Sequence, residues 1–212
     1  MINENTKYAV FDFGGVLFET SRTALYREIF ARKGRSGEEL DYFLNTVFPR
    51  EVASKANLGT MAAVTAARAE EYPEWTDEIQ AFNADREFIG QVRGTVPGMP
   101  EILKAIAGKG YGIFGLTNWA ADTYQTLPTA YPEILGLFDK VVVSGAAGIK
   151  KPDPEIFRLA AQEFGNPAPS QVYYFDDKSG NISAAQEAVG WNGVLFDRKK
   201  DGPRLVAETF GL

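Results

Sequence analysis

Acidic, basic, hydroxyl and amide side chains recur along this chain at, or soon after, the points where expected strands end. In chain order they are Asp12, Thr117-Asn118, Lys151 and Asp176-Asp177. A carboxylate nucleophile, a hydroxyl and amide pair, an ammonium and a second acidic cluster form the set that phosphoryl transfer through an aspartyl-phosphate requires. Three carboxylates would repel an incoming phosphate, so such a site needs a cation. Mg²⁺ fits best, because it is a hard ion held by one or two carboxylates together with substrate oxygens and water.

The composition narrows the chemistry further. The 212 residues include no cysteine and no histidine. These absences exclude disulfides, thiolate zinc sites, cysteine nucleophiles, Ser-His-Asp triads, histidine-ligated metals and phosphohistidine chemistry. The polar chemistry must therefore come from Asp, Glu, Lys, Arg, Ser, Thr, Asn or Tyr, helped by a cation that prefers oxygen ligands.

Charge and hydropathy indicate the surroundings of the protein. The formal net charge of -6 gives no general attraction to nucleic acid or to an anionic membrane, although a local basic pocket is compatible with it. The stretch Met1-Ile2-Asn3-Glu4-Asn5 lacks the basic and apolar regions of a signal peptide, and no apolar run approaches the ~20 residues of a membrane span. We therefore expect a soluble, cytoplasmic protein with no nucleic-acid or membrane partner.

Alternating strands and helices are expected to position the polar residues. The first strand is Tyr8 to Phe11, and the alternation from Pro97 onward favours a parallel sheet covered on both faces. Further strands are expected at 111–116, 140–144, 171–175 and 193–196, with helices at 101–109, 120–127, 152–164, 181–189 and 203–209. Parallel strands end at one edge of a sheet, so the polar groups should converge there. The prediction is an α/β fold with a Rossmann-like three-layer α/β/α core over residues 1–19 and 97–212.

Residues 20–96 instead show helical periodicity, and we predict that they form an inserted helical cap domain. Helices are expected over Arg22 to Lys33, after a capping box of Ser36 and Glu39, from Thr60 to about Glu71, and over Thr76 to Val92. Substrate specificity should lie in the cleft between cap and core. Candidate residues there are Arg22, Tyr26, Phe48 and Arg50. A helical cap can pack on its own core or on that of a neighbour, so a monomer and a homodimer are both compatible with the sequence.

Four sequence motifs occur in a fixed order along nearly the whole chain. They are Asp12-Phe13-Gly14-Gly15-Val16-Leu17, Leu116-Thr117-Asn118, Lys151-Pro152-Asp153-Pro154, and Phe175-Asp176-Asp177 followed by Asn181. This set resembles the haloacid dehalogenase superfamily, and the helical insert between the first two motifs is similar to the C1 cap of that superfamily.

The resemblance implies a role for each motif. Asp12 would be the nucleophile and a metal ligand, Thr117 and Asn118 would hold phosphoryl oxygens together with Gly15, and Lys151 would steady the nucleophile and the transferred charge. Asp177, with Asp176, would complete a Mg²⁺ site to which Gly14 gives its backbone carbonyl. Together these roles imply Mg²⁺-dependent hydrolysis of a small phosphorylated metabolite, such as a sugar phosphate.

Each of these residues also has a simpler structural interpretation. Thr117 could cap the following helix, Lys151 could form a solvated surface pair with Lys150, Asp176-Asp177 could cap the helix after Gly180, and Asn181 could orient Asp177 or merely begin that helix. Trp119 and Phe18 could line a substrate cavity, but a place in the core is the favoured interpretation of both aromatic residues.

The chain departs from the phosphatase pattern of the superfamily at Gly14, where a second aspartate is usual. The general acid/base is lost there, while the backbone carbonyl that would meet the cation is kept. Loss of a positioned acid typically costs ~10²–10⁴ in rate, which a leaving group of low pKa or an acid from the cap could restore. A DxGG motif also resembles a subgroup of sugar-phosphate phosphatases. Glu19, which follows the first motif, is a candidate for the substitute acid.

Two other functions fit parts of this pattern. A 2-haloacid dehalogenase uses the same aspartate to displace halide without a metal, and it also lacks the second aspartate. Dehalogenases, however, resemble one another in a serine-rich fourth motif where this chain has Asp176-Asp177. The other alternative is a non-catalytic member of the superfamily that binds a phosphorylated ligand or a partner protein. Retention of Asp12 with Lys151 argues against this alternative, since binding alone needs no nucleophile.

Overall fold

A five-stranded parallel sheet forms the centre of the molecule, in a computed structural model that describes residues 7–212. Residues 1–6 lie outside the described part of the chain, and they include the stretch Met1-Ile2-Asn3-Glu4-Asn5, which lacks the features of a signal peptide. The strands are β1 (Tyr8–Phe11), β4 (Gly112–Thr117), β5 (Lys140–Val143), β6 (Val172–Asp176) and β7 (Asn192–Leu195), in the order β5-β4-β1-β6-β7. Because β1 pairs with both β4 and β6, Asp12 lies in the middle of the carboxyl edge of the sheet.

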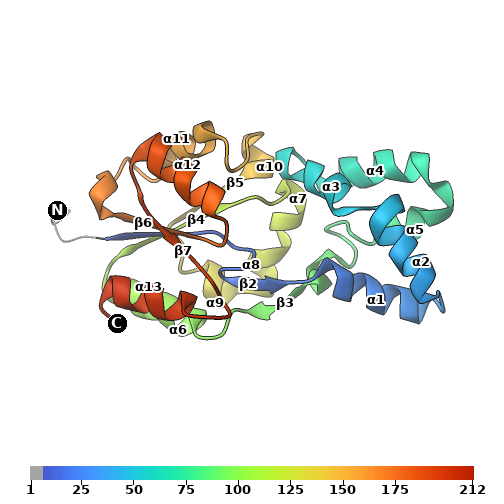
Figure 1. The fold of residues 1–212 in the computed structure, drawn as a ribbon, viewed down its shortest axis with the longest axis horizontal. Coiled ribbons are helices and arrows are strands. Elements are labelled where there is room, and N and C mark those ends of the chain that lie inside the picture. Colours follow the sequence, from blue (N-terminus) through green and yellow to red (C-terminus); the bar gives the residue numbers. More distant parts are fainter. Residues whose placement is uncertain (1–6) are drawn as a thin grey trace.

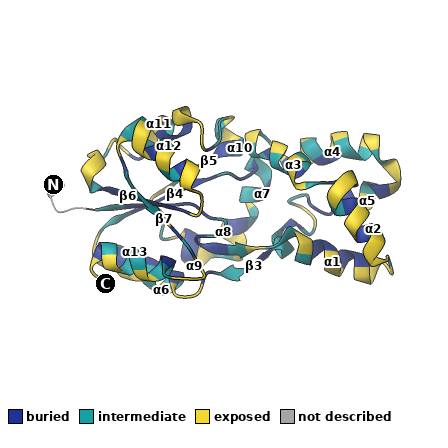
Figure 2. Cartoon of the chain, in the orientation of Figure 1, coloured by how far each residue is buried: buried dark blue, intermediate teal, exposed yellow. Residues whose placement is uncertain are grey.

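Helices cover both faces of this sheet (Figure 1). They are α6 (Met99–Gly108) and α13 (Gly202–Phe210) on one face, and α11 (Pro154–Glu163) and α12 (Ser179–Val189) on the other. Residues of β1 alternate between the two layers, since Phe11 shares an apolar cluster with Phe210 and Val10 shares the opposite cluster with Phe157. Burial of each large apolar side chain stabilises the fold by ~1.5–3 kcal/mol, and the three central strands β4, β1 and β6 are mostly buried, whereas the edge strand β7 is not (Figure 2). The predicted α/β class with a parallel central sheet is confirmed.

Residues 22–91, named the cap segment below, consist of helices and their connections. The helices are α1 (Arg22–Arg32), α2 (Gly37–Tyr42), the π-helix η1 (Phe43–Val47), α3 (Arg50–Ala53), the 3-10 helix η2 (Ser54–Leu58), α4 (Met61–Glu71), η3 (Pro73–Trp75), α5 (Thr76–Gln80) and η4 (Phe88–Gln91). The predicted caps are present: Ser36 and Glu39 form the capping box, and the Thr60 hydroxyl accepts from the Ala63 N–H. Figure 1 shows α1 to α5 gathered at one end of the long axis, away from the sheet.

The helix predicted over residues 76–92 is wrong. α5 ends at Gln80, and Val92–Thr95 is a strand, β3, that pairs antiparallel with β2 (Phe18–Thr20). The apolar side chains that suggested one helical face meet across a turn, since the rings of Phe82 and Phe88 lie 5.0 Å apart between centroids. Strand pairing between residues so distant in sequence leaves no trace in local periodicity, so the β2–β3 ribbon was not predicted.

The helices that follow β4 are shorter than the sequence indicated. In place of one helix at 120–127 there are three, α7 (Ala121–Tyr124), α8 (Thr126–Ala130) and α9 (Pro132–Leu135). Pro128 does not end a helix, because it lies in the first turn of α8, where its missing N–H has no intrahelical partner to lose. The residues that follow β5 form the short helix α10 (Ser144–Ala147), and the short 3-10 helix η5 (Pro169–Gln171) precedes β6. Within residues 7–212, no helix has the length and apolar character needed to cross a membrane.

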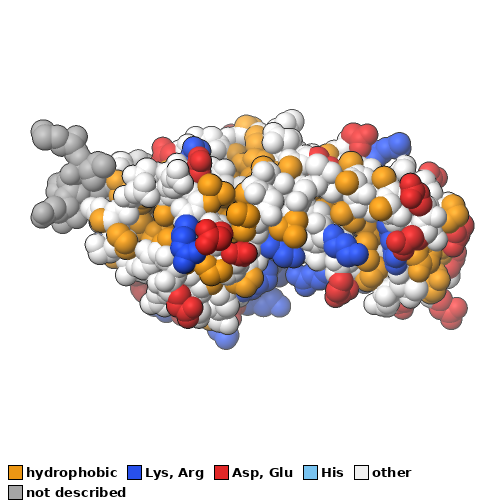
Figure 3. All heavy atoms as spheres, turned by 90° about the horizontal axis from the view of Figure 1, so that it is seen from above, with side chains coloured by type: hydrophobic (Ala, Val, Ile, Leu, Met, Phe, Trp, Pro, Cys, Tyr) orange, Lys and Arg blue, Asp and Glu red, His pale blue; other side chains and the backbone are white. Residues whose placement is uncertain are grey.

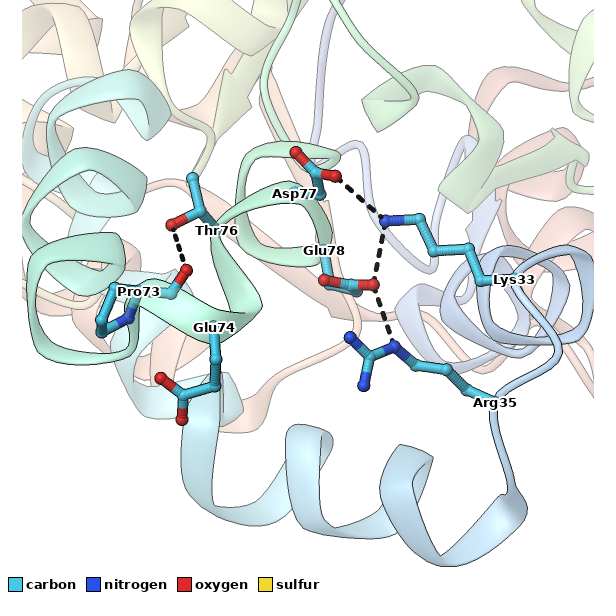
Figure 4. Close-up of a pocket in the computed structure, with 7 residues that line it drawn as sticks. All are labelled: Lys33, Arg35, Pro73, Glu74, Thr76, Asp77 and Glu78. Carbon is cyan, nitrogen blue, oxygen red and sulfur yellow. Dashed lines mark hydrogen bonds and ion pairs between the residues drawn. The ribbon is translucent and has the colours of Figure 1, made fainter.

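A buried ion-pair network holds the outer end of the cap segment together (Figure 4). The Glu78 carboxylate is nearly inaccessible and accepts from Lys33 at 2.9 Å and from Arg35 at 3.1 Å. The Arg35 guanidinium also lies 4.2 Å from the centroid of the Trp75 ring. A hollow of about 620 Å³ beside the network is lined by two basic and three acidic side chains, which largely offset one another, together with Pro73 and Thr76. The network therefore serves the cap structure.

Candidate active site

A cavity of about 650 Å³ lies where the carboxyl edge of the sheet faces the cap segment. Its core side is lined by Asp12, Gly14, Gly15, Thr117, Asn118, Lys151 and Asp177, and its cap side includes Arg22, Arg50, Asn57, Phe82 and Phe88. The structure thus brings together residues from four distant motifs, because β1, β4 and β6 all end at this edge.

The Asp12 carboxylate and the Lys151 ammonium form the buried centre of the site. Lys151 Nζ lies 3.0 Å from Asp12 Oδ1, and the Phe13 N–H donates to the same oxygen at 2.7 Å. Asp12 Oδ2 accepts no hydrogen bond from the residues that the structure describes, so it is free to meet a ligand. Burial raises the pKa of Asp12 above its ordinary value, and the attraction of Lys151 only partly opposes this effect. An added cation would favour the ionised carboxylate that a nucleophile needs.

A second carboxylate, Asp176, fixes the position of Lys151. Lys151 Nζ donates to Asp176 Oδ2 at 2.8 Å and to the Leu116 carbonyl at 2.6 Å. Asp176 also accepts from the Tyr174 hydroxyl, from the Lys178 N–H at 2.9 Å and from the Asn181 amide at 2.9 Å. Burial alone would raise the pKa of Asp176, but these donors, led by Lys151, hold that pKa below its ordinary value. Both oxygens of Asp176 are therefore occupied by protein donors.

The second motif has two different functions in the structure. The Asn118 side chain binds the backbone of Lys151, donating from Nδ2 to its carbonyl at 2.9 Å and accepting from its N–H at 2.9 Å. This clamp uses the amide that we expected to hold phosphoryl oxygens. Thr117 is the last residue of β4 and lines the cavity, and its hydroxyl forms no hydrogen bond with other described residues. Both side chains line the cavity: the Thr117 hydroxyl is free to bind a phosphate, and the Asn118 amide has a second Nδ2–H beyond the one used in the clamp.

The acidic cluster has the composition of a site for a hard cation. Asp12, Asp176 and Asp177 each offer a carboxylate oxygen, and these oxygens lie within 4.8 Å of one another. Asp177 is the most accessible of the three, with 36% of its side chain exposed. A Cβ at Gly15 would come within 2.9 Å of Asp177 Oδ2, so the glycine allows this carboxylate to approach the first motif. The residues therefore fit Mg²⁺, with Asp12 and Asp177 as the carboxylates that have oxygens to spare.

Position 14 has room for the side chain that the sequence lacks. A Cβ built on Gly14 would meet nothing within 4 Å, and Gly14 lines the cavity. Glu19, the candidate for a substitute acid, lies in β2 outside the lining of the cavity, with its carboxylate 4.0 Å from Arg198. The structure thus gives Glu19 no direct access to a ligand held at Asp12.

The structure divides the four residues proposed for specificity into two pairs. Arg22 and Arg50 line the cavity, whereas Tyr26 and Phe48 are fully buried and lie beneath Arg22. The aromatic residues near the motifs, Phe18 and Trp119, are both buried in the core, as favoured. Trp119, which is 7% exposed, also forms part of the cavity wall.

Sequence reasoning missed several residues of this site. Tyr174 donates to Asp176, and its position two residues earlier on the same strand was the available signal, because side chains i and i+2 share a face. Lys178 and Arg198, which also line the cavity, had no comparable signal. Asn181 was expected to orient Asp177 or begin a helix, and the structure shows it bound to Asp176 instead.

A sequence model of the haloacid dehalogenase-like hydrolases matches residues 6–188 of the chain. The match covers most of the chain, and the chain belongs to this family of hydrolases.

Three curated relatives are similar to the chain over different lengths. The sesquiterpene phosphatase astK of Aspergillus oryzae is 31% identical over 96 residues, covering 45% of this chain and 47% of the relative. A probable pseudouridine-5'-phosphatase of Drosophila melanogaster is 26% identical over 216 residues, covering 95% of this chain and 84% of the relative. Drimenol cyclase drtB of Aspergillus calidoustus is 29% identical over 111 residues, covering 52% of this chain and 20% of the relative. The chain therefore spans half or less of two of these relatives.

Solved structures share the fold. A haloacid dehalogenase family enzyme of Bacteroides thetaiotaomicron, in complex with magnesium and inorganic phosphate, has a TM-score of 0.69 at 21% identity, covering 94% of this chain and 98% of that chain. The L-2-haloacid dehalogenase of Xanthobacter autotrophicus has a TM-score of 0.62 at 18% identity, covering 90% of this chain and 77% of that chain. Because a dehalogenase and an enzyme that binds magnesium and inorganic phosphate both share it, the fold does not decide between phosphatase and dehalogenase chemistry.

Proposed function

We propose that this chain is a Mg²⁺-dependent phosphatase that hydrolyses a small phosphorylated metabolite through an aspartyl-phosphate on Asp12. The observation that carries the proposal is the arrangement of Asp12, which has one oxygen fixed by Lys151 at 3.0 Å and the other free at a cavity. The relatives named as phosphatases support the same class of reaction. The proposed division is a core of residues 1–19 and 97–212 with a cap domain of residues 20–96.

The first chemical step is an attack by Asp12 Oδ2 on the phosphorus of the ester. The P–O bond to the leaving group breaks, the phosphoryl group remains bound to the Asp12 carboxylate, and the released alkoxide takes a proton from water. Lys151 faces the transferred charge and stays paired to Asp176, so the ammonium keeps its position throughout. The Thr117 hydroxyl donates to a phosphoryl oxygen. Water then attacks the phosphorus, which releases inorganic phosphate and regenerates Asp12.

Asp12, Asp177 and the backbone carbonyl of Gly14 would hold Mg²⁺. When bound, the ion would neutralise charge on the phosphate oxygens and draw the ester toward the carboxylates. We assign Asp176 to the support of Lys151, because its oxygens already accept from protein donors. The leaving alcohol receives no proton from position 14, so substrates with leaving groups of low pKa, such as anomeric sugar phosphates, fit the site best.

Phosphate release from a panel of phosphate esters, in Mg²⁺ and in EDTA, tests this proposal. We expect turnover that requires Mg²⁺ and disappears in Asp12→Asn, a variant that keeps the size of the side chain and removes the nucleophilic charge. The control is Asp153→Asn, which changes an exposed helix-capping carboxylate outside the lining of the cavity. Retention of full activity by Asp12→Asn would rule out the aspartyl-phosphate.

The alternative is a 2-haloacid dehalogenase, and Gly14 is the observation that favours it, because a halide needs no proton when it leaves. Release of chloride from 2-chloropropionate in EDTA would support that reaction. The cluster of Asp12 with Asp177 argues for the phosphatase, since displacement of halide needs no cation site. Absence of both activities would favour a protein that only binds its ligand.

A further inference from the structure

The cap side of the cavity carries a pair of arginines that the chemistry at Asp12 leaves unused. Arg22 is the first residue of α1 and Arg50 is the first residue of α3, and both line the cavity. Neither forms an ion pair with any residue in the described range 7–212, unlike Arg32, Arg35 and Arg93 elsewhere in the chain. Two unpaired guanidiniums at the wall of an active-site cavity are suited to bind an anion.

The surroundings of Arg22 hold its guanidinium in place. It lies over the rings of Tyr26 and Phe48, at 5.7 Å and 5.6 Å from the centroids, and donates to the Phe48 carbonyl. Since a guanidinium has five N–H donors, most of them stay available for a ligand. A group fixed before binding loses little conformational entropy when the ligand arrives.

The two guanidiniums repel each other. Burial lowers the pKa of Arg22, and the charge of Arg50 lowers it further, although Glu51 offsets part of this effect. Arg50 is exposed and forms no side-chain hydrogen bond or ion pair with the described residues. An anion placed between them would relieve the repulsion.

The charge of the whole cavity lining also favours the binding of an anion. Its lining has five basic side chains, namely Arg22, Arg50, Lys151, Lys178 and Arg198, against the carboxylates of Asp12 and Asp177. Lys151 and Arg198 are also paired with Asp176 and Glu19, which lie outside the lining, so an excess of one positive charge remains. This excess is found in a protein whose net charge is -6. Figure 3 shows Lys and Arg side chains gathered near the middle of the long axis, where core and cap segment meet. Once a phosphate dianion and Mg²⁺ have offset each other, the positive excess of the lining is still present.

We infer that Arg22 and Arg50 form a second anion subsite, so that the substrate is a small phosphate ester that carries a further carboxylate or phosphate. This inference rests on the proposed phosphatase function. The reacting phosphate would lie at Asp12, the carbon skeleton beside Phe88 and Trp119 of the wall, and the second anion at the two arginines.

Matched pairs of esters test the subsite. 3-Phosphoglycerate and glycerol 3-phosphate share a three-carbon skeleton and differ by a carboxylate. Glucose 1,6-bisphosphate and glucose 1-phosphate share the anomeric phosphate and differ by a second phosphate. We expect kcat/KM to favour the more anionic member of at least one pair by about 10- to 100-fold, as for a hydrogen-bonded charge pair. The pair that shows the preference identifies the second anion.

Variants at position 50 assign the preference to the cap. Arg50→Gln should reduce the ratio of kcat/KM within the preferred pair at least tenfold, and Arg50→Glu should favour phosphoethanolamine, which carries a cation, over 3-phosphoglycerate. Arg27→Gln is the matched control, because Arg27 is an exposed arginine of α1 that does not line the cavity. It should keep the wild-type ratio.

Binding measurements separate the subsite from the chemistry. Calorimetric titration of Asp12→Asn protein with each pair of esters in Mg²⁺ measures the preference without turnover, and circular dichroism checks that each variant is folded. A preference in binding that Arg50→Gln abolishes supports the subsite, even if p-nitrophenyl phosphate shows that the phosphatase proposal fails. Equal binding within both pairs, or a preference that survives in folded Arg50→Gln and Arg50→Glu, would overturn the subsite and leave the phosphatase proposal intact.

Discussion

Substitution of Asp176 by asparagine should destabilise the protein more than any other single change at the acidic cluster. The carboxylate accepts from Lys151, Tyr174, the Lys178 N–H and Asn181, and it has no solvent exposure. Removing one partner of a buried ion pair costs about 3–5 kcal/mol. Lys151 keeps Asp12 at 3.0 Å, so we expect the lower end of that range, ~3 kcal/mol. This is a large part of the ~5–15 kcal/mol by which a domain is stable.

The same substitution at the neighbouring carboxylates, Asp12 and Asp177, should have a much smaller effect on stability. Burial raises the pKa of Asp12, so its ionised form is unfavourable in the fold, and Asp12→Asn should change the free energy of unfolding by less than ~1 kcal/mol or increase it. Asp177 is partly exposed, and Asp177→Asn should stay within ~0.5 kcal/mol of the wild type. We therefore expect Asp176→Asn to lower the free energy of unfolding much more than Asp12→Asn or Asp177→Asn.

Urea unfolding followed by tryptophan fluorescence measures these differences, since Trp75, Trp119 and Trp191 are all buried. With a slope of ~2–3 kcal/mol per molar urea, the Asp176→Asn midpoint should fall by about 1 M. Mg²⁺ at ten times its dissociation constant should stabilise the wild type and Asp176→Asn by ~1.4 kcal/mol and leave Asp177→Asn unchanged. If Asp176→Asn proves no less stable than Asp12→Asn, or loses the response to Mg²⁺ while Asp177→Asn keeps it, our assignment of the carboxylates is wrong.

Three further predictions concern the same edge of the sheet. The side chain introduced by Gly14→Asp would enter open space. This variant should raise kcat for esters with poor leaving groups, such as alkyl phosphates, by up to ~10²–10⁴ and leave kcat for p-nitrophenyl phosphate nearly unchanged. An equal effect on both substrates would show that a missing acid does not limit the rate. The pKa of Asp176 is held below the ordinary 3.8, so the contribution of its ionised carboxylate to the free energy of unfolding is fully present above about pH 4 and is lost as the pH falls further. The difference in stability between the wild type and Asp176→Asn, measured in urea, should therefore be the same at pH 7 and pH 5 and smaller at pH 3. Gly15→Ala puts a side chain at a φ of 86° and against Asp177, so it should cost ~1–2 kcal/mol of stability and weaken Mg²⁺ binding measured by calorimetry; a variant with unchanged affinity would contradict the close approach.

The central sheet was predictable because its inner strands are buried on both faces. Such strands appear in sequence as short apolar runs with polar residues at their ends, and parallel topology then brings those ends together. Asp12, Thr117 and Lys151 were therefore expected at one edge before any coordinates were known. The structure agrees, since all three line one cavity.

The separate roles of individual residues inside the site were not predictable in the same way. Asp176 and Asp177 are adjacent and chemically identical, and only the strand geometry turns one toward Lys151 and leaves the other accessible. The clamp of Asn118 on the Lys151 backbone joins residues 33 positions apart, which no local pattern reveals. The helix expected over 76–92 failed for a related reason, because the pairing of β3 with β2 depends on a partner far away in sequence.

The β2–β3 ribbon brings the two ends of the cap segment together. The segment leaves the core after Thr20 and returns at Val92, and these two residues face each other in the ribbon. The Ser21 N–H donates to the Gln91 carbonyl at 2.7 Å, so the two ends of the segment already touch. A short turn could therefore join the two ribbon strands in place of residues 22–91, and a replacement cap would have to restore the contact in which the Asp122 carboxylate accepts from the Met61 and Ala62 N–H groups. Transplantation of another helical cap at these two positions would then transfer its choice of substrate onto an unchanged hydrolytic core.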